Sequence, residues 1–159
     1  MTRRSVLAAV AAGLSFAVLA VDGASAQTMK SVAGAYTIAK TEAYGEKPRG
    51  QLILTAEGRY ALVLRRGDLK PIAAGARVKG TPEENKMVVD GSIAHYGTYT
   101  IDDGGKSITF NVEGSTFPNW DGKPQKRPLK VSGDTLTYAV AAPSAGNKPG
   151  EVSWRRIRK

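Results

Sequence analysis

Short stretches in which apolar and polar residues alternate recur along most of the chain, separated by Gly, Asp, Pro and other turn-forming residues. Successive side chains of a strand point to opposite faces, so this alternation predicts strands with one buried face. Stretches of this kind cover residues 36–43, 51–55, 59–65, 97–101, 107–113, 126–131, 135–141 and 152–158. Short strands at such regular spacing, joined mostly by tight turns, predict an up-and-down antiparallel arrangement.

One segment between the third and fourth predicted strands breaks this pattern. Residues 66–80 have no clear period, and the following Thr81-Pro82-Glu83-Glu84 supplies a helix N-cap, a proline at N1 and a glutamate at N3. We therefore expect a short helix that ends at Gly91 or a few residues beyond, acting as a lid or plug on one end of a barrel. The predicted fold is all-β: an eight-stranded up-and-down antiparallel β-barrel with one short helix between strands 3 and 4. A barrel of this size is either filled by side chains or holds one small ligand.

The first 26 residues are typical of an export signal. Arginines at positions 3 and 4 precede an uncharged, Ala/Val/Leu-rich run over residues 5–21 and the small triplet Ala24-Ser25-Ala26. These are the basic, apolar and cleavage regions of a signal peptide, so we expect cleavage after Ala26 and export to the periplasm or the medium. The paired arginines fit either the general or the twin-arginine route. Residues 27–159 are then expected to form a single barrel domain. The apolar run is shorter than the ~20 residues that a spanning helix needs, and a cleavage site follows it, so we interpret it as a signal and not as a membrane anchor. No integral membrane span is therefore expected in the mature chain.

The near absence of reactive side chains limits the chemistry. The sequence holds no Cys and a single His, His95. An activated hydroxyl or thiol nucleophile would lack its usual base, and one His with scattered carboxylates matches no metal-ligand spacing. We expect no cofactor and no metal, and we favour binding over catalysis. His95 follows the predicted helix closely, and we expect it to be exposed or to cap that helix.

Several segments together carry a family resemblance. They are residues 50–59, 81–84, 96–99, 112–120 and 154–156, of which the Glu-Gly-Ser-Thr-Phe-Pro-Asn-Trp block at 113–120 is the most distinctive. In order and spacing they resemble the bacterial lipocalin-like domain family over roughly residues 32–156. The resemblance implies a calycin-like β-barrel with an internal cavity. It implies little about chemistry, because barrels of this class include both carriers and isomerase or cyclase enzymes.

Polar and aromatic residues near the barrel interior or its mouth form the candidate ligand-binding set. These residues are Tyr60, Tyr99, Asn111, Glu113, Asn119, Trp120, Arg127 and Trp154. The aromatic residues on strands serve equally well as core, and the Asn-Trp pair after a proline can close the rim instead of contacting a ligand. Along residues 107–113 the alternation does not say which face is the interior.

Arg127 shares a strand face with Leu129 and Val131, whereas Lys126 and Lys130 lie on the opposite face. We therefore expect the arginine to point inward, where its charge needs a partner. The leading expectation is a structural ion pair with Glu113. The alternatives are a ligand carboxylate oriented by Arg127, or simple exposure.

These features favour an exported lipocalin-like barrel that binds a small, mainly apolar molecule in an internal cavity. One alternative is an acid–base isomerase or cyclase, with Glu113 as acid or base and Tyr99 or Arg127 stabilising an oxyanion. Another is a basic surface module that acts by interaction or inhibition.

The positive charge belongs to the mature domain. The formal net charge of +9 falls only to +8 when the first 26 residues are removed. A nucleic-acid site would need exposed stacking aromatics beside the basic residues, and an exported protein does not meet the usual target, so we expect no nucleic-acid partner. The charge leaves room for a weak electrostatic association with an anionic lipid or polysaccharide surface, which moderate salt would abolish.

Overall fold

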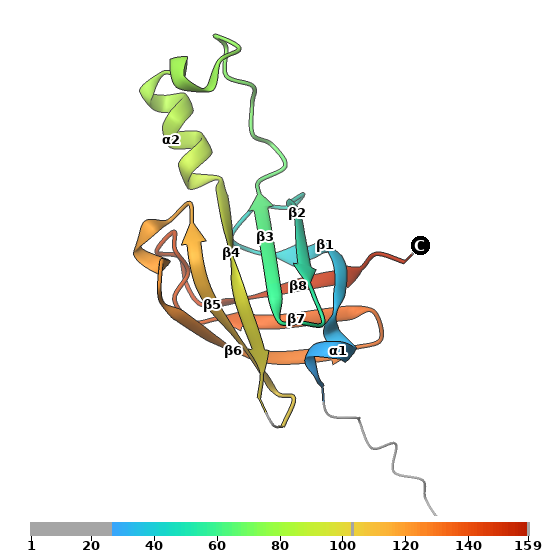
Figure 1. Cartoon of the computed structure of the whole chain (residues 1–159). Helices are drawn as coiled ribbons and strands as arrows, with labels where there is room; N and C mark the ends of the chain where they lie inside the picture. The colour runs from blue at the N-terminus through green and yellow to red at the C-terminus, as the bar shows by residue number, and fades with distance from the viewer. Residues whose placement is uncertain (1–26, 103, 159) are drawn as a thin grey trace, which may run out of the picture.

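The computed structural model of the chain describes residues 27–102 and 104–158. Its eight strands close into one antiparallel barrel in which each strand pairs with its neighbours along the chain and β8 returns to pair with β1 (Figure 1). The strands are β1 (Gly34–Thr41), β2 (Arg49–Leu54), β3 (Arg59–Arg65), β4 (Ser92–Ile101), β5 (Ser107–Ser115), β6 (Pro124–Ser132), β7 (Thr135–Val140) and β8 (Gly150–Arg156). The predicted eight-stranded up-and-down barrel is confirmed.

Alternate residues of every strand face the interior of the barrel. In β3, for example, Tyr60, Leu62 and Leu64 are buried and the residues between them are exposed. In β5 the inward residues are Ile108, Phe110 and Val112, which leaves Asn111 and Glu113 on the outer face. Because the hydrophobic side chains of β5 are the ones that gain from leaving water, burial decides the face that the sequence pattern left open.

One end of the barrel is closed by a short helical turn, α1 (Met29–Val32). The Tyr36 hydroxyl donates to the carbonyl of the last residue of α1 at 2.6 Å. The Tyr99 hydroxyl donates to the carbonyl of its first residue at 3.2 Å and to the Thr55 carbonyl at 2.7 Å. Two buried phenols therefore tie the turn to the barrel and satisfy backbone acceptors there.

Arg156 of β8 adds a third tie at this end. Its guanidinium donates to the carbonyls of Ala33 and Ser31 and lies 4.8 Å from the centre of the Tyr36 ring. A cation placed at the C-terminal end of a helical turn satisfies carbonyls that have no partner within the turn.

The helical insertion lies between β3 and β4 and comprises η1 (Arg77–Lys79) and α2 (Pro82–Asp90). The predicted N-cap of this helix is confirmed. The Thr81 side chain accepts a hydrogen bond from the Glu84 N–H, and the Glu84 carboxylate accepts one from the Thr81 N–H. Helix α2 extends away from the strands (Figure 1) and has no buried residue. The expectation of a lid or plug is wrong, since no residue of α2 lines the interior cavity described below.

The predicted signal peptide falls on residues 1–26, which lie outside the described residues, and cleavage after Ala26 stays a prediction. Within the described part of the chain, no helix combines the length and the hydropathy needed to cross a membrane.

Gly97 gives a stability prediction. The β4–β5 register shifts between Tyr96 and Gly97, and a Cβ at Gly97 would lie 2.0 Å from the Asn111 carbonyl oxygen. Gly97→Ala should lower the free energy of unfolding by about 1–3 kcal/mol, because backbone must move to admit the methyl group. The matched control is Gly150→Ala, where an added Cβ has no heavy atom within 4 Å. Urea denaturation should show less than about 0.5 kcal/mol for the control, and equal losses would contradict the steric explanation.

Candidate functional site

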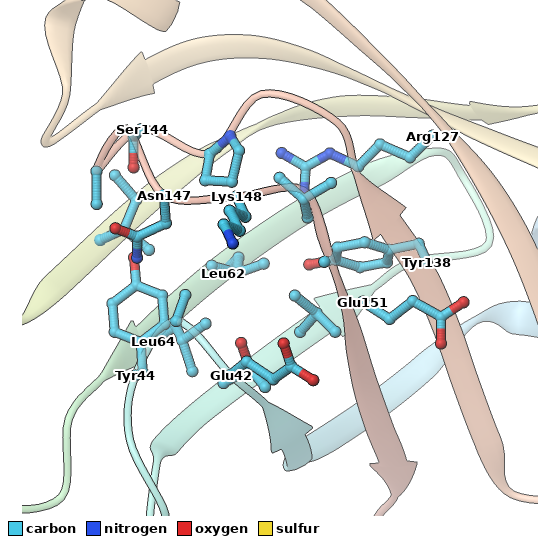
Figure 2. Close-up of a pocket in the computed structure, with 18 of the residues that line it drawn as sticks. Glu42, Tyr44, Leu62, Leu64, Arg127, Tyr138, Ser144, Asn147, Lys148 and Glu151 are labelled. Atoms are coloured by element: carbon cyan, nitrogen blue, oxygen red, sulfur yellow. The ribbon is translucent and has the colours of Figure 1, made fainter.

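A cavity of about 290 Å³ lies at the end of the barrel opposite α1. It is lined by residues of β1, β3, β4, β6, β7 and β8 and by Trp120 of η2 (Pro118–Trp120). Residues 42–44 of the β1–β2 loop and residues 143–145, 147 and 148 of the β7–β8 loop complete the lining. Figure 2 shows Arg127 and Tyr138 reaching into it from one side, with Tyr44, Ser144 and Asn147 together on the other. The described residues therefore form a barrel with one hollow end and one tied end.

The apolar wall of the cavity comes from two paired strands. Leu62 and Leu64 of β3 pair with His95 and Ile93 of β4, respectively, and all four side chains are buried and line the cavity. Because cross-strand partners on one face are in contact, this register places a single imidazole beside an aliphatic surface.

Arg127 points inward, as the alternation in β6 predicts, and is only 5% exposed. Its guanidinium lies 5.0 Å from the ring centre of Tyr138, 5.5 Å from that of Phe110 and 5.7 Å from that of Trp120. Each contact is a cation–π interaction worth about 0.5–2 kcal/mol. In the part of the chain that the structure describes, no carboxylate lies within ion-pair distance of this guanidinium.

The expected ion pair between Arg127 and Glu113 is wrong. Glu113 lies on the outer face of β5, where its carboxylate accepts two hydrogen bonds from Arg59, at 2.6 and 2.9 Å. Both side chains of that pair are about half exposed, so it contributes little stability. A carboxylate on the outer face also cannot serve as acid or base towards a molecule inside the barrel.

The expectation of an exposed or capping His95 is also wrong. Strand β4 begins at Ser92, five residues before the predicted start at Gly97, and this extension turns His95 inward with 4% of its surface exposed. Its Nδ1 lies 2.9 Å from the Tyr60 hydroxyl. The imidazole packs edge-on against the Trp120 ring, with 5.6 Å between the two ring centres. The alternation of apolar and polar residues that predicts a strand is missing here. The inward positions hold His95 and Gly97, which are not hydrophobic, whereas the large Tyr96 faces outward.

The electrostatics of the cavity are those of one permanent cation among neutral groups. Burial and, as the smaller cause, the nearby Arg127 charge together lower the pKa of His95 to about 3. Burial also raises the pKa values of the Tyr60 and Tyr138 phenols, which the Arg127 charge only partly offsets. At neutral pH the imidazole is therefore uncharged and both phenols keep their protons.

Of the eight predicted ligand-binding residues, Trp120 and Arg127 line the cavity. Asn119 is adjacent to Trp120 in η2, but it is exposed and does not line the cavity. Asn111 is exposed on the outer face of β5, where its amide lies 3.4 Å from the Thr98 hydroxyl. A ligand contact for any of these side chains stays a prediction.

The three remaining aromatic candidates are buried outside the cavity lining. Tyr60 lies next to the cavity through its contact with His95, whereas Tyr99 holds the tied end of the barrel. Trp154 is fully buried, and its indole N–H, which is completely shielded from solvent, has no hydrogen bond of normal geometry. That N–H still opposes the rise in the pKa of the neighbouring Tyr138 phenol.

Sequence reasoning missed Tyr138, His95 and the β7–β8 loop as cavity residues. Tyr138 carries a usable signal, since it and the buried Leu136 alternate with half-buried neighbours in β7. The loop at 143–148 carries none, because it has no period. Among the described residues there is no cluster of three or more His, Cys, Asp or Glu that could hold a metal ion.

The sequence profile of the lipocalin-like domain matches residues 28–157, so the chain belongs to the lipocalin-like domain family. One relative is the 4'-hydroxy-3'-methoxypropiophenone carrier protein ppsC of Aspergillus oryzae (strain ATCC 42149 / RIB 40), which is 27% identical over 89 residues, or 50% of this chain and 80% of that protein. Among solved structures, the lipoprotein YedD from Klebsiella pneumoniae subsp. pneumoniae MGH 78578 is 13% identical with a TM-score of 0.42, covering 80% of this chain and 73% of that one.

The low pKa of His95 predicts a pH-dependent stability. Between pH 6.5 and about 3 the unfolded chain binds a proton at His95 that the folded chain does not, so stability falls as the pH falls through this window. The loss from this one group should be about 2 kcal/mol between pH 7 and pH 5. Urea denaturation at both pH values should show this loss in the wild type and not in His95→Gln. The same loss in both proteins would contradict the buried, neutral imidazole.

Proposed function

We propose that this protein is an exported carrier that binds a small, mainly apolar molecule in the hollow end of its barrel. The single observation that carries the proposal is the cavity itself, in which aliphatic side chains of β3 and β4 face a buried Arg127. A concave apolar surface with few polar groups is the usual form of a small-molecule site. Glu113, the group that an acid–base reaction would use, lies on the outer face, which favours binding over catalysis.

The size of the cavity supports a small ligand. At ~30 Å³ for each water molecule of the liquid, its 290 Å³ corresponds to about ten waters. Covalently bonded atoms pack more closely than waters, so the cavity suits a molecule of on the order of ten to fifteen non-hydrogen atoms. A long-chain lipid would not fit without enlarging the barrel.

The carrier relative in Aspergillus oryzae supports the ligand class. Its name assigns it a single-ring aromatic ketone. In this chain the rings of Trp120 and Tyr138 contribute to the cavity lining, and such rings stack or pack edge-on against an aromatic ligand. We infer that the ligand here carries an aromatic ring and a hydrogen-bond acceptor.

The outward lysines of β6, Lys126 and Lys130, are separate from this site. They support a weak, salt-sensitive association of the outer surface with an anionic lipid or polysaccharide.

Blocking the cavity should abolish binding. In Leu62→Trp the larger ring enters the cavity, whereas in Val63→Trp, one residue along β3, it points to solvent from a position that is 48% exposed. Calorimetry with a panel of small aromatic compounds should give a wild-type Kd of about 1 µM, or ~8 kcal/mol, for the best member. The cavity variant should bind at least tenfold more weakly and the control should match the wild type. Equal binding by all three proteins would place the site elsewhere.

Export predicts a defined mature terminus. The small residues at 24–26 suit signal peptidase, so intact-mass measurement of protein recovered from the periplasm or the medium should give a chain that starts at Gln27. Ala26→Trp should leave the precursor uncut, because the cleavage site accepts only small side chains. Recovery of the full-length wild-type chain from the cytoplasm alone would contradict export.

A further inference from the structure

The buried charge of Arg127 lacks a counterion within the described part of the chain. Glu42 and Glu151 line the same cavity, but neither carboxylate lies within ion-pair distance of the guanidinium. The three aromatic rings around it supply quadrupole attraction, and the Tyr138 phenol adds one neutral hydrogen-bond partner, but neither replaces a full counter-charge. A planar guanidinium in such a place matches the planar, two-oxygen geometry of a carboxylate.

The proton position on His95 follows from its contact with Tyr60. The phenol oxygen lies 2.9 Å from Nδ1, and the described residues offer the Tyr60 hydroxyl no other acceptor. If Nδ1 carried the proton, the buried phenol O–H would be left without a partner, which is unfavourable. The phenol therefore donates to a bare Nδ1, and the ring proton sits on Nε2.

This tautomer makes His95 a donor towards the cavity. The imidazole lines the cavity, its Nδ1 is already used, and Nε2 has no partner among the described residues. His95 and Arg127 also contact the same two rings, Phe110 and Trp120, so their donors lie in one region of the cavity. A neutral donor beside a cationic donor selects a head group that only accepts hydrogen bonds and carries one negative charge.

We propose that this region is a carboxylate subsite, in which the Arg127 guanidinium and the His95 Nε2–H together hold the anionic head of a small aromatic carboxylic acid. The proposal rests on the carrier function above and names the class of its ligand. Tyr60 acts as a positioning residue, because it holds His95 in the donor tautomer without touching the ligand.

The first test compares an acid with its amide. Cinnamate and cinnamamide have nearly the same size and shape, but the amide is neutral and presents N–H groups to the two donors. Calorimetry on the wild-type protein should show cinnamate binding at least tenfold more tightly. Arg127→Met should bring the two affinities together, whereas Lys126→Met, which removes an outward cation one residue earlier on β6, should keep the tenfold preference.

The second test reads the tautomer directly. The sequence has one His, so ¹⁵N NMR of the tag-free protein reports His95 without overlap. The spectrum should show a protonated Nε2 and a bare Nδ1, and cinnamate should shift the Nε2–H signal. In Tyr60→Phe the proton should redistribute between the two nitrogens and cinnamate affinity should fall several-fold, while binding of a neutral aromatic hydrocarbon should not change.

The outcomes separate the two proposals. If cinnamamide binds as tightly as cinnamate, or if the proton sits on Nδ1, the carboxylate subsite is overturned and the carrier function stands. If no member of the aromatic panel binds, the carrier function falls and the subsite with it. Should Arg127→Met fail to fold, Arg127→Gln removes the same charge, and the wild-type comparison and the NMR measurement still decide.

Discussion

Pairing of the last strand with the first determines the organisation of this protein. Once β8 is hydrogen-bonded to β1, the sheet has no free edge, and every residue of every strand faces either the interior or solvent. Only the inward-facing side chains of the eight strands can then occupy the interior, and their sizes decide whether the space is filled or leaves a cavity. Large rings fill the end near α1, while smaller aliphatic side chains of β3 and β4 leave the opposite end open.

The same constraint separates the charged groups of the barrel. A shift of register by one residue would exchange the two faces of a strand, so the burial of Leu129 commits Arg127 to the interior and that of Val112 commits Glu113 to the surface. Arg127 and Glu113, which the sequence suggested as an ion pair, are thereby kept on opposite sides of the sheet. The interior keeps a cation whose described neighbours are rings, a phenol and a neutral imidazole, and this imbalance gives the cavity its chemical character.

The sequence predicted the strand order, the position of the helix and the inward direction of Arg127, because these depend on local period and on capping residues such as Thr81 and Glu84. It did not predict the first half of β4, where an inward His95 and an outward Tyr96 invert the usual pattern. It also did not predict which strands meet at the cavity, since the contact of His95 with Tyr60 joins residues from two strands through a register that no local signal encodes. The sequence therefore predicted the order of the strands and helix, but not which side chains from different strands come into contact.

The tied end of the barrel has a kinetic consequence. Tyr36, Tyr99 and Arg156 hold α1 across that end, so water that leaves the hollow and a molecule that enters it must pass through the same opening. For any molecule bound in the hollow, exchange would then require that it leave before a second one could enter. The residence time would be governed by the side chains around that opening, including those of the β7–β8 loop, and not by the depth of the barrel.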